Sequence, residues 1–164
     1  MRQFDYGLNY KELNLRDSPE LYVIGKGEQG VLTVEPYKSE ILLFWRFKNP
    51  EVATVSANKI YALFLEYLRE DDFVGADMSR KFLQMGFTRA RRYANYSGGK
   101  KYIGPVPADK KGVSGSHGRE IKKREGEDLV KAESAKIFKM MWERAEENQK
   151  FKKLKELFID KYGR

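Results

Sequence analysis

The chain has 164 residues, with 32 Lys and Arg, 24 Asp and Glu, one His and no Cys, so its formal net charge at pH 7 is +8. A chain without cysteine has no disulfide framework, no thiolate nucleophile and no cysteine-bound zinc, and a single histidine excludes a two-histidine metal site. No apolar run approaches the about 20 residues of a membrane helix, and the first residues contain no apolar signal segment, so we expect a cytoplasmic protein without a membrane span.

Three strands are predicted in the first third of the chain, at residues 21–24, 31–35 and 40–48, because these short runs are rich in β-branched, aromatic and other apolar residues. In the third run, apolar positions on one face alternate with a second face that ends in Arg46 and Lys48. The pattern predicts a small antiparallel meander.

The segment from Gly25 to Gly30 reads GKGEQG and matches the glycine spacing of dinucleotide-binding loops. In those proteins a helix follows the loop and its N-terminus binds the pyrophosphate. Here the predicted strand at 31–35 follows instead, and the chain has no HRD or DFG string typical of protein kinases. We therefore interpret this segment as a glycine-bearing hairpin turn.

A helix is predicted from Pro50 to Arg69, because Asn49 is a favourable N-cap and proline is tolerated in the first turn. A second helix is predicted from about Ala76 to Asn95. On a helical wheel its apolar residues fall on one side, and the opposite side holds Arg80, Lys81, Arg89, Arg91 and Arg92. Two alternatives stay open: one helix with Gly86 on its buried face, or a helix-turn-helix broken at Gly86.

Residues 97–126 contain seven of the fourteen glycines and predict a long basic loop, which in a compact domain is either functional or disordered. Apolar spacing then predicts two helices in 127–164, with a turn near Asn148. The predicted fold is therefore α+β in one domain: a strand-rich part at 1–48, two helices at 49–96, the loop, and a C-terminal helical hairpin.

Positive charge is concentrated in the middle of the chain. Residues 79–124 contain 13 basic and two acidic residues, and no acidic residue occurs between Ser79 and Ala108, so local ion pairs cannot neutralise this segment. Either the basic residues face solvent, or acidic residues of the first third fold over them. The acidic candidates are Glu66, Glu70, Asp71, Asp72 and Asp77.

Basic residues interleaved with tyrosines are typical of surfaces that bind a phosphate backbone and stack bases. We therefore expect non-enzymatic binding of nucleic acid or another polyanion, and no cofactor. The helix and the loop supply the candidate binding residues: Arg80, Lys81, Arg89, Arg91, Arg92, Lys100, Lys101, Lys110, Lys111 and Arg119. The interleaved tyrosines are Tyr93, Tyr96 and Tyr102.

An enzymatic alternative uses other residues of the loop. Asp109 followed by Glu120 and Lys122 is similar to a metal-dependent nuclease pattern, in which two carboxylates hold Mg²⁺ and the lysine activates water or stabilises phosphate charge. His117 is a candidate general base or phosphate contact. A third alternative is a structural or partner-binding protein whose basic surface meets an acidic protein, and a homodimer also stays open.

Several long strings carry a resemblance: GKGEQGVLTVEPYKSEIL, WRFK, DFVGADMSRKFLQMGFTRARRYAN, and GPVPADKKG with SGSHGRE. With these strings the chain resembles a family of bacterial and phage proteins catalogued as a domain of unknown function, family 4385, from about Phe4 to the last predicted helix. The resemblance implies no activity and transfers no catalytic residue to this sequence.

Overall fold

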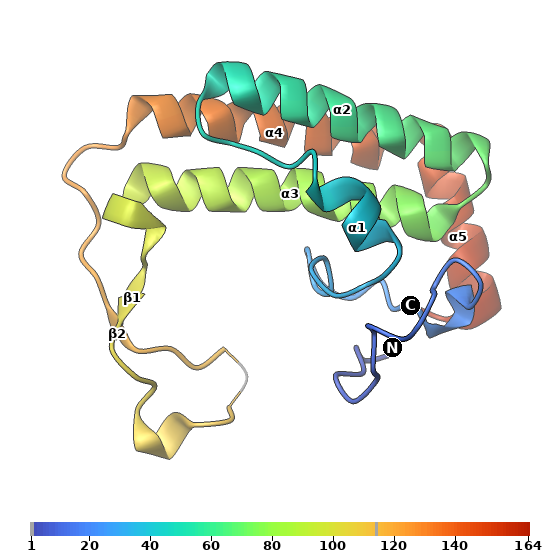
Figure 1. Cartoon of the computed structure of the whole chain (residues 1–164), viewed down its shortest axis with the longest axis horizontal. Helices are drawn as coiled ribbons and strands as arrows, with labels where there is room; N and C mark the ends of the chain where they lie inside the picture. The colour runs from blue at the N-terminus through green and yellow to red at the C-terminus, as the bar shows by residue number, and fades with distance from the viewer. Residues whose placement is uncertain (1, 114) are drawn as a thin grey trace.

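The computed structural model describes residues 2–113 and 115–164 and is mostly helical (Figure 1). Its α-helices are α1 Tyr37–Leu42, α2 Pro50–Arg69, α3 Phe73–Asn95, α4 Leu129–Glu147 and α5 Gln149–Tyr162. Its strands are β1 Tyr102–Ile103 and β2 Arg119–Glu120, and the short 3-10 helices are Pro19–Leu21, Ser97–Gly99 and Ala108–Lys110.

The long helices α2, α3 and α4 run side by side and form the body of the protein (Figure 1). Each begins at a residue whose side chain accepts a hydrogen bond from the first turn, as Asn49 does from the Val52 amide at 2.9 Å and Asp72 from the Gly75 amide at 3.0 Å. Asp128 caps α4 and Asn148 caps α5 in the same way. The prediction of a helix from Pro50 to Arg69 is confirmed, and so is the C-terminal pair of helices with a turn at Asn148.

The predicted α+β fold is wrong, because the strand-rich part at 1–48 is built differently. Leu21 ends a 3-10 helix and residues 22–24 form no strand. Residues 31–35 lie mostly in turns, and the first three residues of the 40–48 run belong to helix α1. In α1 the buried residues are Tyr37 and Ile41, four positions apart, so helical spacing places both on the body of the protein. Among the described residues the only sheet is the antiparallel pair of β1 and β2.

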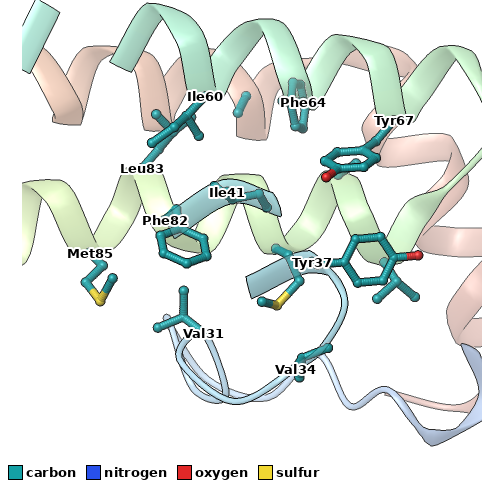
Figure 2. Packing of buried hydrophobic residues seen from close by; sticks show 14 of the residues in the cluster. Val31, Val34, Tyr37, Ile41, Ile60, Phe64, Tyr67, Phe82, Leu83 and Met85 are labelled. Carbon is teal, nitrogen blue, oxygen red and sulfur yellow. The ribbon is translucent and has the colours of Figure 1, made fainter. Parts of the chain in front are cut away.

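The N-terminal segment, which comprises the described residues before α2, covers one side of the helical body (Figure 2). Val31, Val34 and Tyr37 of this segment lie in the same buried cluster as Phe64 of α2 and Phe82 of α3. The phenolic rings of Tyr37 and Tyr67 meet edge to face at 5.6 Å. Irregular backbone therefore replaces the expected sheet as the cover of this core.

Helix α3 is continuous through Gly86, so the alternative of a helix-turn-helix is wrong. Gly86 is buried, and a Cβ built on it would clash with the ring of Phe138 in α4, which is itself fully buried. The absence of a side chain lets the two helices approach closely at this point. None of the helices in the described part of the chain is both long and apolar enough to cross a membrane.

Candidate nucleic-acid interface

Residues 97–126, here called the basic arm, leave the body between the end of α3 and the start of α4 (Figure 1). The outgoing leg continues directly from α3. The returning leg is tied to the end of the same helix, because the Arg124 amide donates to the Asn95 carbonyl at 2.8 Å and, just past the arm, the Asp128 amide donates to the Ala94 carbonyl at 2.9 Å. Beyond this base the arm extends away from the helices. It is therefore a projection held at one place by the C-terminal end of α3.

The arm is folded as a hairpin. Its two legs pair antiparallel, with Tyr102 opposite Glu120 and Ile103 opposite Arg119, and the Ile121 amide donates to the Lys101 carbonyl at 2.8 Å. Next to the pair, Gly118 lies against the carbonyl oxygens of Ile103 and Gly104 in the facing leg, where any side chain would clash.

An aromatic pair stiffens the same part of the arm. The rings of Tyr102 and His117 are stacked, with centroids 3.9 Å apart, and His117 Nδ1 lies 2.7 Å from the carbonyl oxygen of Gly118. Nearer the tip, the Ser116 hydroxyl contacts the carbonyl oxygens of Lys110 and Val113 at 2.7 and 2.6 Å. The long loop predicted from the sequence thus has its own hydrogen bonds and packing.

Most of the predicted loop cations are open to solvent. Lys101 is half-buried, and the other four predicted loop cations are exposed. Within residues 2–113 and 115–164, none of the five forms an ion pair with a carboxylate. Three further exposed cations lie on the returning leg: Lys122, Lys123 and Arg124. Of these, only Lys122 was predicted to have a role, as a catalytic candidate.

The prediction that Arg80 and Lys81 face solvent is wrong. Arg80 is 6% exposed and Lys81 is fully buried, and both surround Asp77, a residue of the same helix. The Arg80 guanidinium donates to Asp77 Oδ1 at 2.7 and 3.0 Å, and Lys81 Nζ lies 3.8 Å from Asp77 Oδ2. Asp77 is one of the five acidic residues that were candidates to neutralise the basic segment. It pairs with two of the five predicted helix cations.

The glycine-bearing segment 25–30 completes this buried cluster. The Gly27 carbonyl accepts a hydrogen bond from Arg80 at 2.7 Å, and the Gln29 carbonyl accepts one from Lys81 Nζ at 2.7 Å. The segment is therefore not the turn of a β-hairpin, because it lies over α3 and satisfies two buried cations. Tyr22 adds a further hydrogen bond from its hydroxyl to Asp77 Oδ2 at 2.5 Å.

Burial and charge act in opposite directions on the ionisable groups of this cluster. Burial raises the pKa of Asp77, but Arg80, Lys81 and the Tyr22 hydroxyl outweigh it and hold that pKa below its usual value. Burial lowers the pKa of Lys81 to about 8, and the attraction of Asp77 opposes only part of this effect. Two cations thus share one carboxylate, and burying the charge of Lys81 costs desolvation free energy.

This arrangement predicts that the protein gains stability as the pH rises from about 8 to about 10. The unfolded chain keeps Lys81 protonated up to its ordinary pKa of about 10.4, whereas the folded chain releases the proton near pH 8, so the unfolded state binds more protons in between. Above pH 10 the effect reverses, because burial raises the pKa of Tyr22, Tyr37 and Tyr67 in the folded state.

Urea unfolding at pH 8, 9 and 10 measures this gain, with Lys81→Met as the matched control. We expect the free energy of unfolding of the wild type to rise by on the order of 2–3 kcal/mol relative to the variant. A wild type and a variant with parallel pH profiles would contradict the assignment of the proton to Lys81.

The remaining arginines of α3 lie near the base of the arm. Arg92 is exposed and Arg89 is half-buried, whereas the Arg91 guanidinium pairs with Glu127 and contacts Asn95 Oδ1 at 3.1 Å. Glu28 of the glycine-bearing segment accepts a hydrogen bond from the Thr88 hydroxyl at 2.9 Å. Burial raises the pKa of Glu28, and the nearby Arg89 and Arg92 oppose that shift.

The residues of the enzymatic alternative all lie in the arm, and two of them line one hollow. Glu120 and His117 line a shallow hollow of about 530 Å³, together with Lys110 and Arg119, whereas Asp109 lies in the 3-10 helix near the tip and Lys122 lies past β2. Throughout the described ranges, no three His, Cys, Asp or Glu side chains are grouped so that they could hold a metal ion. The hollow thus brings together Glu120 and His117, and its lining includes neither Asp109 nor Lys122.

Together the fold and the surface define a class: a helical protein with a folded basic hairpin projecting from one end. The chain belongs to the family described as "Domain of unknown function (DUF4385)", whose model matches residues 5–161. The predicted membership of family 4385 is thereby confirmed. The chain matches no curated protein and no solved structure.

Proposed function

We propose that this protein binds nucleic acid through the basic arm, assisted by Arg89 and Arg92 at its base. The observation that carries the proposal is the position of the charge: the arm holds eight Lys and Arg against three Asp and Glu, and it stands away from the body. When cations that are not paired within the protein neutralise phosphates, the counterions condensed on the nucleic acid are released, and this release is the main source of backbone affinity.

The contrast with Arg80 and Lys81 supports this proposal. Where cations of the same chain are enclosed, the fold supplies a carboxylate, carbonyl oxygens and a tyrosine hydroxyl to satisfy them. Among the described residues of the arm, the exposed cations pair with no carboxylate, and they are open to partners from solvent or from a ligand. A polymer with regularly spaced phosphates matches cations spread along a hairpin.

Salt dependence tests the proposal. Binding of a fluorescein-labelled 20-base-pair duplex is measured by anisotropy at several salt concentrations. If about six cations contact phosphates, the logarithm of the association constant falls with the logarithm of salt concentration at a slope near −5. An affinity that does not change with salt, or no binding at low salt, would reject nucleic acid as the ligand.

A further inference from the structure

The tyrosines among the basic residues are already occupied within the protein. The Tyr93 ring packs against Phe47 at 5.6 Å and lies against Gly99, and Tyr96 is 8% exposed. Tyr102 is stacked on His117. Binding of single strands relies on aromatic side chains that stack on unpaired bases. All three tyrosines already pack against other groups of the protein, and this favours a double-stranded ligand.

The shape of the arm discriminates between kinds of duplex. The major groove of B-form DNA is about 12 Å wide and admits a two-stranded β-ribbon, whereas the major groove of A-form RNA is too deep and narrow for side chains to read. The arm is such a ribbon at β1 and β2, and close contacts at Gly118 and the Tyr102–His117 stack hold its two legs together.

Charged and apolar side chains are distributed along this ribbon in a way that suits a groove. Lys100 and Lys101 lie on the outgoing leg, and Arg119 and Lys122 lie on the returning leg, so cations are available for the phosphates on both walls. Ile103 is 52% exposed on β1. Exposed apolar side chains inside a groove can contact thymine methyl groups.

Resting on the proposed function, we infer that the basic arm binds double-stranded DNA by inserting as a preformed ribbon into the major groove. The ligand is therefore duplex DNA in preference to duplex RNA or single strands, and the folded shape of the arm contributes to affinity in addition to its charge. A flexible basic tail of the same composition would not have this preference.

Two glycine variants separate shape from charge. Gly118→Ala places a methyl group against the facing leg, whereas Gly126→Ala is the same change in the same arm with open space around it. Both variants keep every charge. Affinities for DNA duplex, RNA duplex and single-stranded DNA of equal length are measured at one salt concentration, and circular dichroism checks that the helical body of each variant is intact.

We expect the wild type and Gly126→Ala to prefer duplex DNA by about tenfold or more, and Gly118→Ala to lose that preference while its salt-dependent binding of single strands stays within about twofold of wild type. We also expect methyl green, a major-groove ligand, to displace the protein, and netropsin, a minor-groove ligand, not to do so.

Equal affinity for all three nucleic acids, or wild-type duplex binding by Gly118→Ala, would overturn the groove inference and leave the proposed function intact. Displacement by netropsin alone would also overturn it. Absence of salt-dependent binding to every nucleic acid would instead reject the proposed function itself.

Discussion

Replacing Asp77 with asparagine is expected to destabilise the protein by about 3–5 kcal/mol, because the change leaves two buried cations without a counter-charge. Asp77 is fully buried, and its carboxylate receives hydrogen bonds from Arg80 and Tyr22 while lying near Lys81. A loss of this size is a large part of the about 5–15 kcal/mol that stabilises an ordinary domain. Urea unfolding followed by circular dichroism measures the effect.

Two further variants make the result specific to the buried charges. Asp71→Asn removes an exposed carboxylate that pairs with Lys150 at 3.0 Å, and surface pairs of this kind contribute about 1 kcal/mol or less. Lys81→Met in the Asp77→Asn background removes one of the two uncompensated cations and is expected to restore part of the stability. If Asp77→Asn unfolds at the same urea concentration as Asp71→Asn, the cluster has no such role.

The four long helices α2 to α5 were predictable from the sequence because their signals are local. Asn49 followed by Pro50 marks the start of α2, and the helical spacing of its buried side chains, three or four residues apart along one face, continues to Leu68. In α3 the clean division of apolar and basic residues outweighed Gly86, whose buried contact with Phe138 explains why a glycine is tolerated inside the helix. Both features can be read within one segment of chain.

The predictions of three strands, and of solvent exposure for two of the five helix cations, were wrong for a different reason. Apolar residues in the 40–48 run alternate like a strand, but Tyr37 and Ile41 pack on the body at helical spacing, and tertiary contacts of this kind override local pattern. A helical wheel likewise shows only which residues share a face of one helix. It does not reveal that segment 25–30 folds back over Arg80 and Lys81, since that contact joins residues more than 50 positions apart.

The sequence predicts one basic surface, but in the structure the cations form two groups, one buried and one exposed. Arg80 and Lys81 stabilise the contact between α3 and the N-terminal segment, whereas most of the predicted cations of the arm face solvent. The signal that could have indicated this division is Asp77, which lies three and four positions before the two cations on the same helix, the spacing at which side chains meet. The candidate interface is consequently smaller and lies mostly in the arm.

A matched pair of charge variants tests most directly whether the arm is the nucleic-acid interface. One variant carries Lys→Gln at positions 100, 101, 110 and 111 of the arm, and the other carries Lys→Gln at four lysines exposed on the body: Lys11, Lys136, Lys152 and Lys153. Both variants lose four positive charges, so any difference between them reports the position of the charge.

Anisotropy titrations of the same duplex DNA at several salt concentrations give the affinity and the salt slope of each variant. At about 100 mM salt we expect the arm variant to bind about 10³-fold more weakly than the wild type, with a slope smaller by about 3 to 4, and the body variant to stay within about threefold. Equal losses in the two variants, or an arm variant that binds as tightly as the wild type, would contradict the assignment of the interface to the arm.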